Sequence, residues 1–221
     1  LIYARPHQTP EAWAQELSAA LALGPQHMSL YQLTIEPETP FYKHQAAGKL
    51  TLPDEDSAAQ MYELTQSLCA SAGLPAYEIS NHAAEGHACR HNVASWQGGD
   101  YLGIGPGAHG RVTSLERGAR LSSVAQHSPA QWLAQVEQDG HGWGELHALD
   151  AESVKMEAIL LGLRLAEGLS LEALSARGIA LAETRLRDLR ADGLLTQDPT
   201  RLQASASGRV LLDYLTGRLL G

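Results

Sequence analysis

The chain has little cysteine, no long apolar run and no surplus of positive charge. Its 221 residues include only two cysteines, Cys69 and Cys89, which excludes a disulfide framework. No stretch of about 18 apolar residues predicts a membrane-spanning helix, and no signal-like segment is found. The net charge of −9, without any basic run, argues against a protein that mainly binds nucleic acid or anionic membrane. These absences favour a cytoplasmic protein.

Common catalytic motifs are missing as well. The sequence contains no phosphate loop of the GxxxxGK type and no Ser, His and Asp in the order of a hydrolase triad. With 44% hydrophobic residues, the chain is long enough for one large domain or two smaller ones. All ten histidines lie within residues 1–149, which carry a net charge of −8, whereas residues 150–221 carry −1. We therefore expect two domains.

Residues 1–80 alternate between predicted strands and predicted helices. Thr9 and Asp54 are typical N-caps of the two helices. The predicted strands are Leu1–Tyr3, His27–Ile35 and Ala76–Ser80. The second strand is apolar on both sides, as in a parallel sheet buried on both faces. The alternation indicates an α/β fold, either part of a barrel or a doubly wound sheet.

The last 70 or so residues have a different pattern. Three predicted helices are followed by a hairpin around Asp198-Pro199-Thr200 and by a closing helix, which is typical of a winged helix. The apolar stripe of the first helix is Met156, Ile159, Leu160 and Leu163. The third helix carries Arg185, Arg187 and Arg190 where a DNA reader has its recognition residues. Acidic residues among them favour a solvated face instead.

The stretch Gly86–Gly110 is the densest in chemically versatile residues, with three of the ten histidines and one of the two cysteines. In an extended chain, His87, Cys89 and His91 would point the same way and could hold a transition metal such as structural zinc. Alternatively, Cys89 is a buried apolar residue and the histidines hydrogen-bond locally. A third interpretation makes His91 a ligand or polar contact of a planar cofactor.

A glycine run follows this polar group. It consists of Gly103, Gly105, Gly107 and Gly110. Because glycine has no Cβ and adopts positive φ readily, this spacing permits a close approach of the backbone to a bulky ligand. A tight turn after a strand explains the same glycines equally well.

Six blocks of sequence resemble one known family. They are LIYARPHQT, SLYQLTIEPETPF, LPDEDSAAQMYE, YEISNHA, CRHNVASW and GDYLGIGPGAHG, followed by the winged-helix pattern. In this order they resemble the radical S-adenosylmethionine (SAM) haem chaperones, a group also described as oxygen-independent coproporphyrinogen III oxidase-like proteins. The resemblance extends over nearly the whole chain.

The resemblance implies an incomplete α/β barrel that carries a 4Fe–4S cluster on a CxxxCxxC loop, then SAM, and a C-terminal winged-helix-like domain. This chain has no CxxxCxxC. We therefore expect the C-terminal portion of such a protein, without radical chemistry of its own because reductive cleavage of SAM needs the cluster. The expected parts are barrel residues 1–110 with the haem-motif loop, a connecting segment 111–149, and a winged-helix-like domain 150–221.

The resemblance also implies site residues. His91, Asn92 and Trp96 match the family's HNxxYW motif, whose histidine is implicated in haem binding, so His91 is the expected iron ligand. The positions expected to contact SAM are Ile2, Thr34, Gly105, Gly107 and His109.

Several positions depart from the family pattern. Ser95 replaces the motif's usual tyrosine, which removes an aromatic face. His82 replaces a usual phenylalanine, and Gly110 replaces a serine. Ala4, Arg5 and His7 lie where the first strand usually reads YGLPGQT, which changes the expected SAM contact.

The expected function is haem binding and delivery to acceptor proteins. One alternative is coproporphyrinogen III oxidation in porphyrin biosynthesis on the same scaffold. The alternative from another class is a metal-responsive winged-helix regulator that senses through His87, Cys89 and His91 and binds DNA through its third C-terminal helix.

Overall fold

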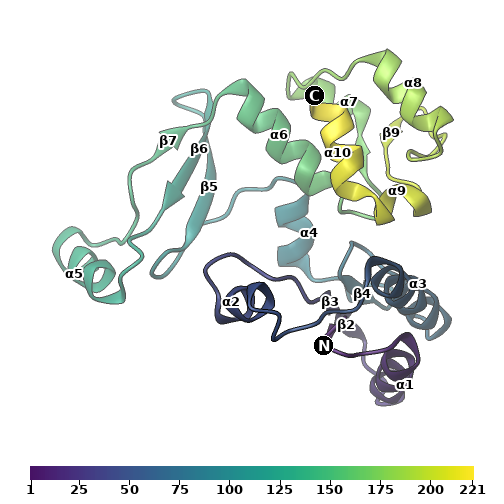
Figure 1. The fold of residues 1–221 in the computed structure, drawn as a ribbon. Coiled ribbons are helices and arrows are strands. Elements are labelled where there is room, and N and C mark those ends of the chain that lie inside the picture. Colours follow the sequence, from purple (N-terminus) through teal and green to yellow (C-terminus); the bar gives the residue numbers. More distant parts are fainter. The chain divides into compact units, whose positions relative to one another are not determined.

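The computed structural model describes all 221 residues, which divide into two compact units, Leu1–Cys89 and Arg90–Gly221 (Figure 1). The boundaries expected at residues 110 and 149 stay predictions. None of the helices combines the length and apolar character that crossing a membrane requires.

The strands of Leu1–Cys89 are short. They are β1 (Ile2–Tyr3), β2 (His27–Ser29), β3 (Tyr31–Gln32) and β4 (Asn81–Ala83). β1 pairs with β3 in parallel, and β2 pairs with β4 antiparallel. Only the first pair has the parallel arrangement expected from the alternating pattern, and Ile2 and Tyr31 are 46% and 49% exposed rather than buried.

Two predicted strands were placed wrongly. The single strand His27–Ile35 is interrupted at the buried Leu30, whose N–H donates to Ser80 O at 2.8 Å. The strand predicted at Ala76–Ser80 is instead a tight turn, because the amides of Tyr77 and Glu78 both bond to Asn81 O. Of the predicted strand, Ala76 keeps a single antiparallel bridge, to His82, and the strand itself begins at Asn81, in β4.

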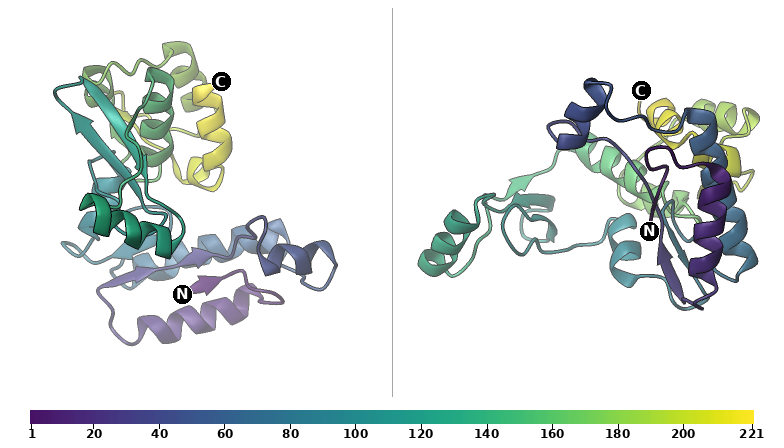
Figure 2. Two further views of the ribbon diagram at one scale, coloured as in Figure 1. Left: turned by 90° about the vertical axis from the view of Figure 1, so that its left-hand side faces the viewer. Right: turned by 60° about the horizontal axis from the view of Figure 1, so that its bottom comes forward.

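Two of the three helices of this unit begin at the predicted caps, Thr9 and Asp54. They are α1 (Pro10–Leu21), α2 (Pro40–Ala46) and α3 (Glu55–Ser71). Thr9 Oγ1 accepts from Ala12 N, and Asp54 Oδ1 accepts from Ser57 N at 2.8 Å, which satisfies donors at the helix ends. The sequence interpretation did not include α2. α1 and α3 pack side by side, as Figures 1 and 2 show.

The core of this unit, called the barrel core, is chemically mixed. It consists of Tyr3, Ala4, Trp13, Leu17, Leu30, Met61, Cys69 and Leu74. Tyr3 stacks on Trp13 with 5.2 Å between ring centroids, and Trp13 Nε1 donates to Thr65 Oγ1 at 2.8 Å. The unit also buries the polar side chains of Glu78, Asn81 and His82.

Two residues after β1 have backbone angles that favour glycine. Ala4 has φ +55° and His7 has φ +62°. The resemblance places glycine at both positions. A left-handed conformation costs an L-residue with a Cβ roughly 1–2 kcal/mol, so this loop is strained relative to the family pattern.

The first part of Arg90–Gly221 is built around an antiparallel sheet in the order β5-β6-β7. Its elements are α4 (Arg90–Trp96), β5 (His109–Ser114), β6 (Ala119–Val124), α5 (Pro129–Asp139) and β7 (His147–Ala148). β5 and β6 form a hairpin that the sequence interpretation missed. The glycines 140–144 lie in the loop between α5 and β7, where a Cβ on Gly142 would come within 2.1 Å of Trp132 Nε1.

The winged helix follows. Its elements are α6 (Ala151–Gly162), β8 (Leu169–Ser170), α7 (Leu171–Ala176), α8 (Glu183–Ala191), β9 (Arg201–Leu202), α9 (Ala206–Val210) and α10 (Leu212–Leu220). β8 pairs with β9 antiparallel, and the bridge Leu195↔Ala204 closes the predicted hairpin. The predicted closing helix is divided at Leu211, which has φ −108° and ψ +34°.

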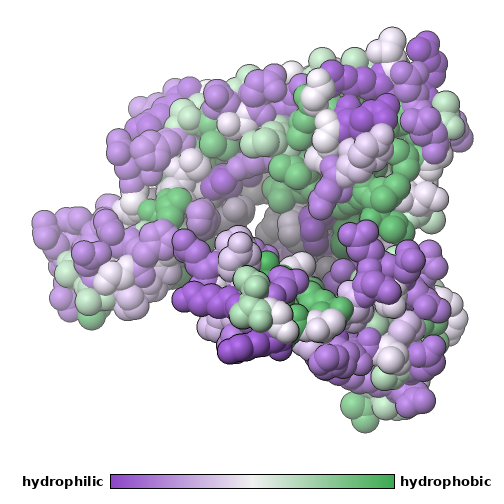
Figure 3. All heavy atoms as spheres, in the orientation of Figure 1, coloured by the Kyte–Doolittle hydropathy of each residue, from purple (hydrophilic) through white to green (hydrophobic).

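The winged-helix core is purely aliphatic. It consists of Ala158, Ile159, Leu163, Leu174, Ile179, Leu186, Leu189, Leu194, Leu195, Leu202, Ala204, Leu215 and Leu219. In α6, the predicted stripe holds for Ile159 and Leu163, but Met156 and Leu160 are 45% and 42% exposed. The buried face turns toward Gly162, because Leu169 packs where a Cβ of residue 162 would lie. In Figure 3, further apolar surface lies over α9 and α10, where Val210 and Leu211 are exposed.

Candidate functional site

The predicted haem motif lies on α4, so the extended conformation assumed for residues 87–91 is wrong from Arg90 onward. His91 is exposed on the first turn of α4, and its ring makes no hydrogen bond or ion pair. Ser95, one turn later, donates its hydroxyl proton to His91 O at 2.9 Å. The motif therefore presents an accessible imidazole with a small hydroxyl group beside it in place of the usual aromatic ring.

Trp96 is half-buried near the end of α4, and one face of its ring is already covered. The guanidinium carbon of Arg164 lies 4.5 Å from the ring centroid, a cation–π contact. The indole Nε1 is buried without a hydrogen-bond partner, the kind of donor that a ligand or water can satisfy. A planar ligand could reach only the edge or the other face of Trp96. Asn92 is half-buried on the same helix.

The glycine run is explained largely by packing within the chain. A Cβ on Gly103 would lie 2.5 Å from His109 O, and one on Gly110 would lie 2.7 Å from Ser123 Oγ. Gly110 therefore leaves room for the Ser123 hydroxyl, which a side chain at this position would have to displace. Gly105 and Gly107 have φ +109° and +68°, as expected of a turn.

The residues predicted to contact SAM are divided between the two units. Ile2 lies in β1, and Thr34 lies two residues beyond β3, with its Oγ1 donating to Glu36 Oε1 at 3.3 Å. Gly105, Gly107 and His109 belong to Arg90–Gly221. Contact of these five residues with SAM stays a prediction.

Metal sites other than a haem ligand receive no support. The structure has no group of three or more His, Cys, Asp or Glu that could hold a metal ion, so the zinc interpretation of His87, Cys89 and His91 fails. Burial raises the pKa of the Cys69 thiol to about 11, which keeps it protonated near neutral pH. With two free cysteines, one of them inert, this chain does not fit a 4Fe–4S cluster.

The arginines of α8 serve the winged helix itself. Arg190 donates from Nη2 to Asp198 O at 3.0 Å and from Nε to Thr196 O, both in the hairpin. Arg185 Nη1 donates to Leu219 O at 3.1 Å. Two of the three arginines considered for DNA reading thus bond to backbone carbonyls of their own domain, which favours a structural role for them over DNA reading.

Arg90–Gly221 contains a charge network that the sequence did not predict. Arg111 Nη2 lies 2.6 Å from Glu157 Oε1, and Arg120 lies 3.2 Å from Asp100 Oδ1 and 3.8 Å from Glu157 Oε2. The hydrogen bond from Thr113 N holds the pKa of Asp100 below its ordinary value. Only the pairing of β5 with β6 brings Arg111 and Arg120 together, and no sequence spacing indicates it.

A second polar group lies within Leu1–Cys89. Glu78, fully buried, accepts at Oε1 from Ser80 N at 2.7 Å and from Asn81 Nδ2 at 2.6 Å. Asn81 in turn accepts from Ser29 Oγ at 2.5 Å. These bonds define the turn before β4, so Glu78 has a structural role and is not placed for acid catalysis.

Comparisons of the sequence identify the relatives of this chain. The family described as HemN C-terminal domain matches residues 149–211. The mouse radical S-adenosyl methionine domain-containing protein 1, mitochondrial, is 35% identical over 229 residues, which cover 100% of this chain and 52% of the mouse protein. The heme chaperone HemW of Mycobacterium tuberculosis is 35% identical over 221 residues, which cover 100% of this chain and 54% of HemW. Over its whole length the chain is similar to the HemN- and HemW-like radical SAM proteins.

A solved structure shows the fold of this HemN- and HemW-like chain. Coproporphyrinogen III oxidase (HemN) from Escherichia coli, a radical SAM enzyme, matches with a TM-score of 0.71 and 21% identity, covering 99% of this chain and 53% of HemN. The predicted fold class is confirmed: α/β, with the C-terminal part of a radical SAM barrel followed by a winged-helix-like domain. The chain spans about half the length of the relatives it matches.

Proposed function

We propose that this chain is the haem-binding portion of a haem chaperone, with His91 as the iron ligand. The observation that carries the proposal is the exposed imidazole of His91 on α4, which no other side chain engages. Relatives named heme chaperone, at 35% and 30% identity, support the same assignment. Under this proposal, haem and haem-acceptor proteins are the partners.

The ligand residues of this chain suit haem better than they suit SAM or a 4Fe–4S cluster. A neutral imidazole is a common axial ligand of haem iron, which supplies the site's affinity for a flat macrocycle. His91 binds, while Asn92 and Trp96 orient the edge of the ligand and exclude water from it. Haem as cargo is held and released, so no residue of this chain needs to move protons or electrons.

SAM and a 4Fe–4S cluster are proposed only for a longer protein that includes cluster ligands. In such a protein, Ile2, Thr34, Gly105, Gly107 and His109 are the positions through which this part would contact SAM. Cytoplasmic location is likewise a proposal, and several relatives carry the word mitochondrial in their names.

Titration of the 221-residue chain with hemin tests the proposal. The wild type should give a shifted Soret band, and His91→Ala should bind about tenfold more weakly or worse, a loss of at least ~1.4 kcal/mol, with a different band position. His44→Ala, which removes an exposed histidine from α2, is the matched control and should behave as the wild type. Identical titrations for His91→Ala and the wild type would remove the assignment.

The alternative function is coproporphyrinogen III oxidation, which the likeness to the Escherichia coli enzyme keeps open at the level of fold. It is preferred if a longer protein with a reconstituted cluster converts the porphyrinogen anaerobically. The chaperone proposal predicts no conversion but transfer of haem from the loaded protein to an apo acceptor.

A further inference from the structure

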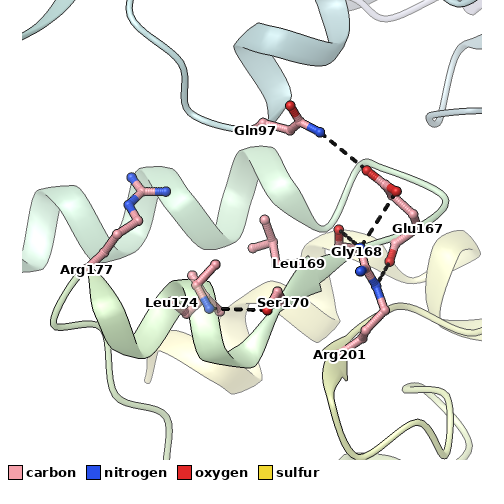
Figure 4. A pocket seen from close by; sticks show the side chains of 9 residues that line it. Gln97, Glu167, Gly168, Leu169, Ser170, Leu174, Arg177 and Arg201 are labelled. Atoms are coloured by element: carbon pink, nitrogen blue, oxygen red, sulfur yellow. Dashed lines mark hydrogen bonds and ion pairs between the residues drawn. The ribbon is translucent and has the colours of Figure 1, made fainter.

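A pocket of about 340 Å³ lies where the end of α4 meets the winged helix (Figure 4). Its lining includes Gln97, Glu167, Leu169, Ser170, Leu174 and Arg177. The volume is within the range of small-molecule sites, about 300–1,000 Å³. All of these residues belong to Arg90–Gly221.

One end of the pocket is electrically balanced. Arg201 donates from Nε to Glu167 O at 2.6 Å and from Nη2 to Gly168 O at 3.0 Å, and Nη2 lies 3.8 Å from Glu167 Oε2. Gln97 Nε2 donates to Glu167 Oε1 at 3.4 Å. The donors and acceptors at this end are thus engaged with one another, as the dashed lines in Figure 4 show.

The other end carries an unbalanced positive charge. Arg177 makes no hydrogen bond and no ion pair, and its guanidinium nitrogens lie 3.4 Å from where a Cβ of Gly98 would be. Arg177 is exposed at the rim of the pocket, where partial desolvation and then repulsion by Arg120 lower the pKa of its guanidinium. The carboxylates near Arg120, those of Asp100 and Glu157, are already paired.

The surface between the two ends suits an alkyl chain with a polar tip. Leu169 and Leu174 supply apolar wall, and Ser170 Oγ accepts from Ala173 N, which leaves the hydroxyl proton free to donate. An arginine with no partner, a hydroxyl donor and an aliphatic wall together match a carboxylate on a short alkyl chain.

The pocket also lies at the end of the helix face that carries His91. His91 and Ser95 lie one turn apart on α4, whereas Gly98, with φ +72°, lies in the turn that ends this helix: its N–H donates to Ser95 O at 3.0 Å, and Gly99 N donates to Ala94 O at 2.8 Å. At 1.5 Å per residue, α4 rises by about 7.5 Å from His91 to Trp96, two residues before Gly98. A flat ligand held by His91 along this face would bring its edge toward Arg177.

We propose that the Arg177 pocket binds an alkyl carboxylate, with Arg177 as its ion-pair partner. Resting on the proposed function, the source of this carboxylate is a propionate side chain of the tetrapyrrole. A free monocarboxylate has the same chemistry and is the other possible source.

The test compares hemin with hemin dimethyl ester, which lacks the carboxylate charge. Wild-type chain should bind hemin about tenfold more tightly than the ester, since hydrogen bonds to charged groups are the strong ones. Arg177→Gln should lose this preference while the Soret position stays unchanged, and Arg177→Lys should recover part of it. Arg187→Gln, at an exposed arginine that pairs only with the neighbouring Asp188, should keep the preference.

Butyrate alone distinguishes the two sources. Binding of butyrate by the wild type and not by Arg177→Gln, without any ester discrimination, identifies a free monocarboxylate as the ligand of the pocket. A wild type that neither discriminates the ester nor binds butyrate overturns the inference, as does Arg177→Gln with both properties intact. The proposed function is tested separately, by the Soret response of His91→Ala, so the two can fail independently.

Discussion

The winged-helix core contains only leucine, isoleucine and alanine, whereas the barrel core mixes Tyr3, Trp13, Met61 and Cys69 with aliphatic residues. The unit with the mixed core also buries Glu78, Asn81 and His82. An aliphatic core is stabilised by apolar burial alone, but buried polar groups need specific partners and so determine local backbone geometry. The winged helix therefore depends mainly on apolar burial, whereas Leu1–Cys89 also depends on particular hydrogen bonds.

The largest effect should come from a cavity in the winged-helix core. Leu189 is fully buried in α8, and Leu189→Ala should lower the free energy of unfolding by about 2–5 kcal/mol. Met156→Ala, at a 45% exposed position of α6, is the control and should change it by less than about 0.5 kcal/mol. Urea denaturation followed by circular dichroism measures both. Equal effects would contradict the assignment of the two faces of α6 and α8.

The next largest effect should come from the buried polar groups of Leu1–Cys89. Glu78→Ala leaves the donors Ser80 N and Asn81 Nδ2 without their acceptor, which should cost about 1–3 kcal/mol for each donor that water cannot reach. Glu63→Ala, on the exposed side of α3, should be nearly neutral. If Glu78→Ala is also neutral in urea denaturation, the buried polar groups do not hold the turn before β4.

A stabilising change is expected in the loop after β1. His7→Gly relieves a positive φ angle at an exposed residue and should raise stability by up to about 1 kcal/mol, the strain relief being partly offset by the greater entropy of the unfolded chain. Ala14→Gly, inside α1, should instead lower stability by roughly 0.5–1 kcal/mol. Thermal unfolding of the two variants gives the signs directly, and a loss of stability for His7→Gly would refute the strain.

The smallest effect concerns the hairpin of β5 and β6, which neither core contains. The pKa of Asp100 is held below its ordinary 3.8, first by the hydrogen bond from Thr113 N, so its contribution is present above that pH and is lost as pH falls through the lowered value. Asp100→Asn should therefore weaken the acid dependence of the urea midpoint below about pH 4, by under about 1 kcal/mol for a partly exposed group. Asp139→Asn is the control and should keep the wild-type dependence. An unchanged profile for Asp100→Asn would sink the prediction.

The sequence predicts the winged helix well because its apolar residues recur at helical spacing and its caps, such as Ser170, are typical. Prediction was worse for Leu1–Cys89. A strand was predicted at Ala76–Ser80, but the side chain of Glu78 accepts a hydrogen bond that forms a turn there, and the observed strand is Asn81–Ala83. The hairpin of β5 and β6 was missed because its alternation is carried by short and polar residues. Positive φ at Ala4 and His7 has no signature in the residues themselves.

The candidate site was predicted in part. Local sequence placed His91, Asn92 and Trp96 together, and they do share α4. It could not indicate Arg177, which lies 79 positions after Gly98 and comes near it only through tertiary packing. It also could not show that Arg164 already covers Trp96.

The bonds from Arg190 to the carbonyls of Thr196 and Asp198 have a consequence for recognition. They join α8 to the hairpin, so both present their outer surfaces as one preformed shape. A preformed surface loses little conformational entropy when it is covered, so any contact made there keeps more of its interaction free energy than the same contact made by a flexible hairpin would.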